Sequence, residues 1–156
     1  MTMKYLLALT ASLLLAGCVT APKALQGEFS AIEPGQSARE GRLGDRVRWG
    51  GRIVDVAPQA TRTCFEIVGV RLGSDGRPLA RDQSSGRFLA CRTGFYDPEV
   101  FLPGREVTVT GQVDGHEDRK VGDYDYRYPR LAADVVFLWP ERRNVDVIVE
   151  RSPFFW

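Results

Sequence analysis

The sequence predicts an all-β protein, and three observations favour this fold class. Segments in which apolar and polar residues alternate recur along the chain, and each has the length of a strand. The 16 Gly among 156 residues provide the many short turns that connect such strands. With 44% apolar residues the chain is globular rather than disordered, and its size gives one domain with one core.

Residues 1–17 are predicted to be a lipoprotein signal peptide. Lys4 precedes an apolar run, Tyr5–Ala16, that ends in small residues, which is the order of charge, core and cleavage site in a secretory signal. As a helix, these 12 residues would span about 18 Å, too little to cross a hydrocarbon core of about 30 Å. The order Leu15-Ala16-Gly17-Cys18 resembles the bacterial lipoprotein signal, in which the Cys thiol is lipidated, the peptide is cut before the Cys, and the new amine is acylated.

This interpretation predicts that Cys18 begins the mature chain and carries a covalent lipid, the only cofactor expected. Several acyl chains make such an attachment effectively permanent. Val19 stands where an Asp would favour retention in the inner membrane under the enterobacterial sorting rule. We therefore expect an anchor in the outer membrane, with the domain on its periplasmic face. The alternatives are an ordinary signal peptide with a Cys nearby and a buried apolar helix.

The mature chain is close to neutral. Removing Lys4 with the signal peptide leaves 21 − 1 = 20 basic residues against 20 acidic ones. A protein that binds nucleic acid by neutralising phosphates needs an excess of positive charge. The composition therefore argues against a nucleic-acid partner.

Cys64 and Cys91 remain as an even pair in the exported part of the chain, where the compartment is oxidising. A disulfide between them would close a loop of about 28 residues, worth about 3.6 kcal/mol in the chain-entropy model. The alternatives are two buried thiols and a redox pair. The chain has no Cys-x-x-Cys motif, which disfavours the redox pair.

Residues 18–42 are predicted to be a lipidated N-terminus and flexible tether. From Val19 to Gly41 the chain is rich in Ala, Gly, Pro, Ser and Glu and shows no sustained period. Two alternatives stay open. Phe29 and Ile32 would fold back onto the domain, and Pro34–Arg39 would form one helical turn.

Residues 43–141 are predicted to form the barrel domain, beginning with three strands. The first strand begins at Asp45 and ends before Pro58, and Gly50-Gly51 interrupts its alternation, which predicts a long strand bent at a bulge. The second runs over 63–71. A loop rich in Gly, Ser, Asp and Pro follows over 72–85, and the third strand runs over 87–92.

A short helix and two more strands complete the predicted domain. Asp97 and Pro98 are typical of a helix start, and Pro103-Gly104 limits this helix to Leu102. The fourth strand runs over 106–113, a charged loop over 114–122, and the fifth strand over 131–139. Three strands, a helix and two strands favour a five-stranded Greek-key barrel of the oligonucleotide/oligosaccharide-binding (OB) kind. Five strands are few for the rival β-sandwich.

Residues 142–156 form a C-terminal extension. Val145, Val147 and Val149 alternate, which would add a sixth strand or seal a sheet edge. The chain ends in Phe154-Phe155-Trp156, aromatic residues that would contact headgroups or a partner protein.

Several motifs in the same order resemble the Slp family of bacterial outer-membrane lipoproteins. They are Val47-Arg48-Trp49-Gly50-Gly51-Arg52-Ile53, Gly86-Arg87-Phe88-Leu89-Ala90, Gly94-Phe95-Tyr96-Asp97-Pro98, Gly104-Arg105-Glu106-Val107-Thr108-Val109-Thr110-Gly111, Tyr126-Arg127-Tyr128-Pro129 and Leu138-Trp139-Pro140. The resemblance covers most of the chain after Arg42. It implies an outer-membrane lipoprotein associated with starvation or stationary phase, and it implies no catalytic residue.

Tyr124, Tyr126 and Tyr128 alternate with charged residues, so in an extended segment their rings share one face. Such a row would bind a glycan or peptide by stacking, or it would cover one end of the barrel. We favour packing and keep ligand binding as the alternative.

No catalytic or metal site is predicted. His116 is the only histidine, and it lies among consecutive charged residues that read as a solvated loop, whereas a metal needs three or four ligands held in geometry. No Ser, His and acid arrangement is available without it. Arg46, Arg48 and Arg52 alternate along the first strand, and we expect them on a solvated outer face.

Overall fold

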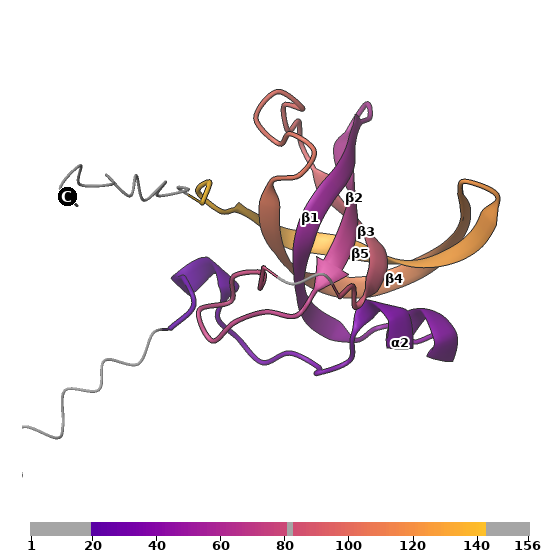
Figure 1. Ribbon diagram of the computed structural model, residues 1–156, viewed down its shortest axis with the longest axis horizontal. Coiled ribbons are helices and arrows are strands. Elements are labelled where there is room, and N and C mark those ends of the chain that lie inside the picture. The colour runs from indigo at the N-terminus through magenta and orange to yellow at the C-terminus, as the bar shows by residue number, and fades with distance from the viewer. Residues whose placement is uncertain (1–19, 81–82, 143–156) are drawn as a thin grey trace, which may run out of the picture.

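Five strands close into a barrel in the computed structural model, which describes residues 20–80 and 83–142 (Figure 1). The strands are β1 (Arg46–Pro58), β2 (Arg62–Val70), β3 (Gly86–Thr93), β4 (Glu106–Val121) and β5 (Tyr124–Leu138). Around the barrel they follow the order β1-β2-β3-β5-β4, and β4 pairs with β1 to close it. Only the pairing of β3 with β5 is parallel. The predicted OB-like Greek-key barrel is therefore confirmed.

β1 pairs with β2 and with β4, and the two pairings overlap at Gly50 and Gly51. Both residues pair with β2 on one side and with β4 on the other. A Cβ atom on Gly51 would overlap the carbonyl oxygen of Val68, so only glycine permits this approach of the strands. The bulge predicted at the two glycines lies instead between Ile53 and Asp55, where the register with β2 shifts.

Apolar side chains that alternate along the strands fill the barrel. Trp49 on β1 and Phe88 on β3 meet edge to face, with ring centroids 5.3 Å apart. The other buried members of this core are Ile32, Val47, Ile53, Phe65, Ile67, Ala90, Val107, Val109, Val113, Leu131 and Val136. The apolar positions of the period-two pattern are thus the positions that face the core, and on β4 the intervening Thr108 and Thr110 are buried as well.

The connection between β3 and β4 forms a single turn rather than the predicted helix. The amide of Phe101 donates to the carbonyl of Asp97 at 3.0 Å, and no α-helix is assigned over 97–102. Phe101 turns inward instead, where its ring lies 5.3 Å from the rings of Phe65 and Tyr96. Burial of this aromatic cluster decides the local conformation against continuation of the helix.

The N-terminal segment packs on the barrel from residue 20 onward. It contains a 3-10 helix, η2 (Lys23–Leu25), and the α-helix α2 (Pro34–Glu40), which lies where a helical turn was one of the open alternatives. Ile32 is buried, and its carbonyl accepts a 2.7 Å hydrogen bond from Trp49 Nε1. The folding-back alternative therefore describes residues 20–41, and the free-coil interpretation does not extend past residue 19.

The β4–β5 hairpin continues beyond the barrel as an arm, residues 114–130 (Figure 1). A charged loop over 114–122 and a fifth strand beginning at Leu131 were predicted, and both boundaries are wrong. The strands stay paired to the tip, where Gly122 turns with a φ of 61°. The sequence here resembles a loop because solvent reaches much of the arm, and cross-strand pairs of opposite charge contribute to its stability.

Cys18 and residues 143–156, with the predicted sixth strand and aromatic end, lie outside the described residues.

Candidate functional site

The chain contacts the barrel soon after the predicted lipid anchor. Thr20 is the first described residue and stands two positions after Cys18. Leu25 is fully buried and packs against Trp139, which follows β5. The Leu25 carbonyl accepts a hydrogen bond of 2.9 Å from Arg48 Nη1 on β1. A short stretch of chain, rather than a long coil, therefore separates Cys18 from the barrel wall.

Arg46, Arg48 and Arg52 differ in how far solvent reaches them. Arg46 and Arg52 are exposed, as predicted, and Arg46 Nη1 pairs with an Asp134 carboxylate oxygen at 3.1 Å. Arg48 is half-buried, and its guanidinium lies 5.3 Å from the centroid of the Phe29 ring. The prediction of a solvated position is wrong for Arg48 because the N-terminal segment covers it.

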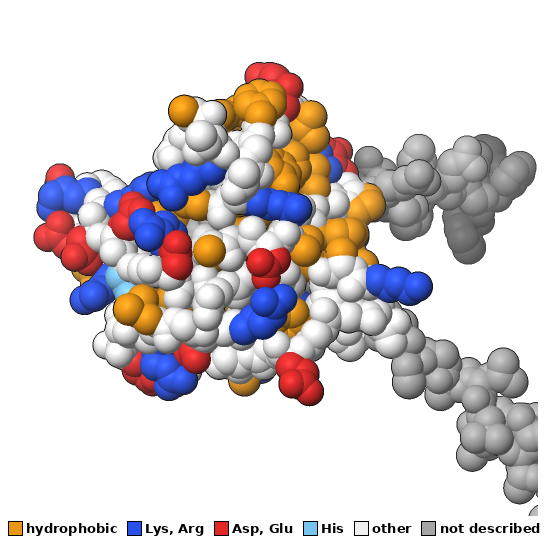
Figure 2. Space-filling model, turned by 180° about the vertical axis from the view of Figure 1, so that it is seen from behind, with side chains coloured by type: hydrophobic (Ala, Val, Ile, Leu, Met, Phe, Trp, Pro, Cys, Tyr) orange, Lys and Arg blue, Asp and Glu red, His pale blue; other side chains and the backbone are white. Residues whose placement is uncertain are grey.

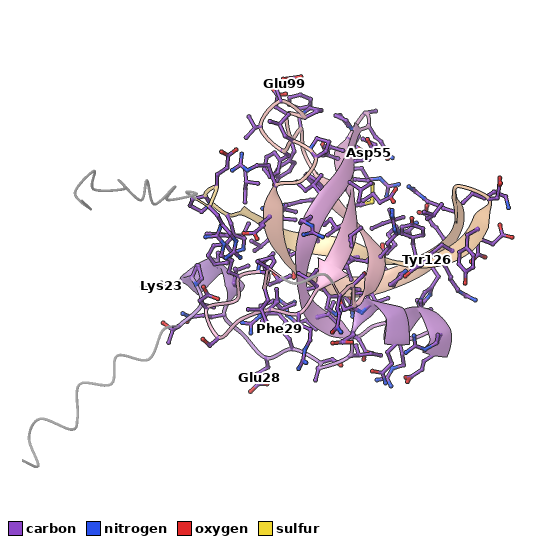
Figure 3. All side chains as sticks on the ribbon, in the orientation of Figure 1. Lys23, Glu28, Phe29, Asp55, Glu99 and Tyr126 are labelled. Carbon is purple, nitrogen blue, oxygen red and sulfur yellow. A yellow bond between two sulfur atoms is a disulfide. The ribbon has the colours of Figure 1, made fainter. Side chains whose placement is uncertain are left out.

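The predicted disulfide joins Cys64 on β2 to Cys91 on β3. The two residues are opposite each other in the antiparallel register, with Cα atoms 4.0 Å apart, and are 27 positions apart in the sequence. Figure 3 shows the bond in yellow. Both residues are buried, so the bond has a structural role and holds β2 and β3 together.

The three tyrosines share one face of β5, as their spacing predicted. The ring centroids of Tyr124 and Tyr126 lie 6.3 Å apart, and those of Tyr126 and Tyr128 lie 5.1 Å apart. The exposed fraction falls from 70% for Tyr124 to 1% for Tyr128. The row therefore runs from solvent at the tip of the arm into the barrel wall, and Tyr128 is a packing residue.

Tyr126 and Tyr128 hold the arm against β2 and β3. The Tyr128 hydroxyl donates to Glu66 Oε1 at 2.9 Å, and the same oxygen accepts from Arg87 Nη1 at 2.7 Å. The Tyr126 hydroxyl accepts the backbone N–H of Arg87 at 3.1 Å, which satisfies a strand-edge donor. These contacts hold the base of the arm against β2 and β3.

Burial and the Glu66 carboxylate set the protonation of this network. Burial raises the pKa of Tyr128, and the hydrogen bond to Glu66 raises it further. Burial lowers the pKa of Arg87, but its hydrogen bond to Glu66 helps to reverse this effect, and the pKa is raised overall. The hydroxyl therefore stays protonated as a donor and the guanidinium stays charged.

A groove of about 520 Å³, which we call the arm groove, lies between α2 and the arm. It is lined by Gly35, Ala38, Arg39, Tyr124, Asp125, Tyr126 and Arg127, and Tyr126 is labelled in Figure 3. Its volume is within the range of small-ligand pockets, and aromatic rings beside charged side chains suit a glycan or a peptide.

His116 lies on β4 within the arm and not in the predicted loop. Its Nε2 is 3.3 Å from the Ser37 carbonyl oxygen on α2, so the ring connects the arm to the helix. The neighbouring Glu117 accepts hydrogen bonds from Arg119 and Arg130. Within residues 20–80 and 83–142, no group of three or more His, Cys, Asp or Glu side chains is arranged to hold a metal ion.

A second groove, the basic groove, has a volume of about 480 Å³. It is lined by Arg52, Arg77, Leu102, Pro103, Gly104, Arg105, Glu106, Trp139, Pro140, Glu141 and Arg142. Sequence reasoning missed it because its four arginines come from four separate segments, so no motif or spacing connects them. The one available signal was that nearly all basic residues are Arg, the side chain suited to binding oxyanions.

In the part of the chain that the structure describes, no helix is long and apolar enough to cross a membrane.

Comparison with protein families matches residues 15–156 to the outer membrane lipoprotein Slp family. The chain belongs to the Slp family. The match confirms the resemblance that the motifs indicated, and the chain is an outer-membrane lipoprotein of this family.

Three relatives illustrate how this Slp-family chain compares with other proteins. It is 40% identical over 131 residues to the uncharacterized lipoprotein YeaY of Escherichia coli K12, covering 80% of this chain and 66% of YeaY. It is 36% identical to an uncharacterized protein of Haemophilus influenzae, over 85% and 74% of the two chains. It is 28% identical to the outer membrane protein Slp of E. coli K12, over 90% and 77%. No solved structure matches the chain.

Proposed function

We propose that a lipid on Cys18 holds this Slp-family barrel at the periplasmic face of the outer membrane, where it has a non-catalytic structural or interaction role under starvation or other stress. The main support is the packing of the N-terminal segment. Leu25 and Ile32 are buried on the barrel, so the domain is held close to its anchor and not at the end of a long flexible tether. A domain held in this way presents one face to the envelope, which suits a structural or interaction protein.

The anchor is tested by replacing Cys18. We expect Cys18→Ala to abolish incorporation of labelled palmitate and to remove the protein from the outer-membrane fraction. Val19→Asp is the matched variant, because it retains the thiol and should move the labelled protein to the inner membrane. Normal labelling and normal fractionation of Cys18→Ala would refute the proposal.

The support for a stress role is the resemblance of the motifs to the Slp family. A strain that lacks the protein should survive prolonged starvation or acid exposure less well than its parent, and expression of the wild-type chain should restore survival. Restoration by Cys18→Ala to the same level would show that the anchor is dispensable for this role.

A second candidate function is the binding of a cell-wall glycan or peptide in the arm groove. Its support is Tyr124, which is 70% exposed beside the charged residues of a groove of about 520 Å³. Tyr124→Ala should weaken binding of muramidase-released cell-wall fragments, whereas Phe95→Ala, an exposed aromatic on another loop, should leave it unchanged. Equal affinity of the two variants, or no affinity in the native protein, would remove this candidate.

A further inference from the structure

We infer that the basic groove binds the phosphate of a phospholipid headgroup, and that this contact fixes how the barrel stands on the membrane. The inference rests on the proposed lipid anchor at Cys18 and adds a second, non-covalent contact with the same surface. Four observations support it: the short distance from the anchor to the barrel, the position of the groove, its positive charge and its apolar rim.

The anchor limits how far the docked segment can lie from the bilayer. Three residue steps separate Cys18 from Ala21, which is buried on the barrel. An extended chain covers at most ~3.6 Å per residue, so Ala21 lies within about 11 Å of the lipidated residue. The headgroup layer on one side of a bilayer is itself about 5–7 Å thick. The face of the barrel around Ala21 therefore lies at or beside the headgroups.

The basic groove belongs to this face. Ala21 and Leu25 cluster with Trp139, and Trp139 lines the groove. A Cβ atom on Gly76 would lie 3.2 Å from the Ala21 side chain. The next residue, Arg77, places its guanidinium 5.5 Å from the Trp139 ring centroid. The first and last described segments, indigo and yellow in Figure 1, accordingly lie on the same side of the molecule.

The groove carries an excess of positive charge. Its four arginines face two acidic residues, Glu106 and Glu141. Glu106 is shared, since its two carboxylate oxygens pair with Arg77 at 2.7 Å and with Arg142 at 2.9 Å.

The other two arginines of the groove are less neutralised. Arg52 is exposed and has no ion pair within the described residues. Arg105 donates from Nη2 to the Trp139 carbonyl at 3.0 Å and from Nη1 to the Val100 carbonyl at 3.4 Å, and within the described ranges its charge faces only the exposed Glu141, 3.7 Å from its Nε. Its positive charge thus adds to the potential of the groove, and Arg52 is the guanidinium that is free to bind directly. Guanidinium groups bind phosphate through two parallel hydrogen bonds, which makes this groove suited to a phosphate.

An apolar rim extends from the groove. Leu102 lines the groove and is 41% exposed, and Val100 and Phe95 on the same loop are 50% and 73% exposed. Figure 2 shows orange side chains from the top of the molecule down its right-hand side. Exposed Phe and Leu side chains beside basic residues are typical of surfaces that bind at the membrane interface. A phosphate in the groove would bring the glycerol and upper acyl region of its lipid toward this rim.

The test compares the lipidated full-length chain in two kinds of vesicle. One contains phosphatidylethanolamine and phosphatidylglycerol, and the other contains digalactosyldiacylglycerol, whose headgroup has no phosphate. Hydrogen exchange is measured over residues 100–106 and 139–142. We expect exchange to be slower in the phospholipid vesicles by about tenfold, the factor that one charge-assisted hydrogen bond provides. Added inorganic phosphate should not reproduce this protection in the glycolipid vesicles.

Charge reversals identify the side chains that are responsible. Arg52→Glu should remove most of the protection, and because Arg52 is exposed and unpaired among the described residues, the variant should fold. Arg105→Glu added to it should remove the rest. Arg62→Glu is the matched control, since Arg62 is exposed but lies outside the groove. Thermal midpoints of all the variants establish that they are folded.

Three outcomes overturn the inference. If exchange is equal in the two kinds of vesicle, no lipid phosphate is bound. Flotation with both kinds would then show that the lipid anchor is present and that only this inference is wrong. Protection by free phosphate alone shows an anion site that is not a lipid site. If the wild-type chain floats with neither kind of vesicle, it carries no lipid anchor, and both the proposed function and this inference are wrong.

Discussion

The hydroxyl of Tyr128 on β5 lies 2.9 Å from Oε1 of Glu66 on β2, and this contact joins two strands that are not neighbours in the barrel. It holds the base of the arm across β3, which lies between them. The side chains of Tyr126 and Tyr128 thereby cover part of the surface of β2 and β3. Accessible aromatic surface in this region is left mainly at Tyr124.

Tyr128→Phe should lower the free energy of unfolding by about 1–2 kcal/mol, because it leaves the Glu66 carboxylate without one of its two donors. Tyr124→Phe is the control, since Tyr124 is 70% exposed, and it should change stability by less than about 0.5 kcal/mol. Urea denaturation followed by circular dichroism measures both. Equal stabilities would show that the hydroxyl contact contributes nothing.

Replacing both Cys64 and Cys91 with Ala should lower the free energy of unfolding by roughly 3–4 kcal/mol, the value of a loop of this length in the chain-entropy model. The variant should have the same stability with and without reductant, whereas the wild type should lose stability only when it is reduced. A wild type that is insensitive to reductant under unfolding conditions would contradict a closed disulfide.

Gly51→Ala should destabilise the barrel by about 3 kcal/mol or more, because the new Cβ overlaps the Val68 carbonyl and the strands must separate. Asp55→Ala, at an exposed position of the same strand, should have an effect within about 0.5 kcal/mol. Thermal unfolding of the two variants gives the comparison. A stable Gly51→Ala protein would mean that β1 and β2 are not in close contact there.

The arm should lose stability in acid through Glu117. Burial raises the pKa of this carboxyl, but hydrogen bonds from Arg119 and Arg130 outweigh burial and the pKa lies below its usual 4.5. A lowered folded-state pKa stabilises the fold above the unfolded value, and this contribution is lost as the pH falls through the folded value.

Glu117→Gln should therefore flatten the loss of stability below pH 4.5, the unperturbed value for this carboxyl. Glu99→Gln, at an exposed position with no ion pair in the described ranges, is the control. Denaturation midpoints across the acid range are the measurement. Identical pH profiles for wild type and Glu117→Gln would show that protonation of Glu117 does not change the stability of the fold.

The strands were predictable wherever one face lines the apolar core, because period-two alternation such as that of Val107, Val109 and Val113 marks the side chains that point into it. The same rule failed at the arm, because solvent reaches much of the strand surface there and, in its β4 half, apolar and polar residues do not alternate. Asp97 predicted a helix because capping is a local signal, but burial of Phe101 against Phe65 stopped the chain after one turn. The tyrosine row and its packing were predicted from spacing, but spacing did not distinguish the buried Tyr128 from the exposed Tyr124.

From the sequence alone came the predicted export signal, the candidate lipid site at Cys18, the barrel class, the pairing of Cys64 with Cys91 and the family. These are determined by local order or by motifs that stand in line along the chain. The tertiary structure decided that residues 20–41 pack on the barrel and that four distant arginines share one groove. Both depend on surfaces assembled from separate segments, because Leu25 finds an apolar partner in Trp139 only once the barrel has closed.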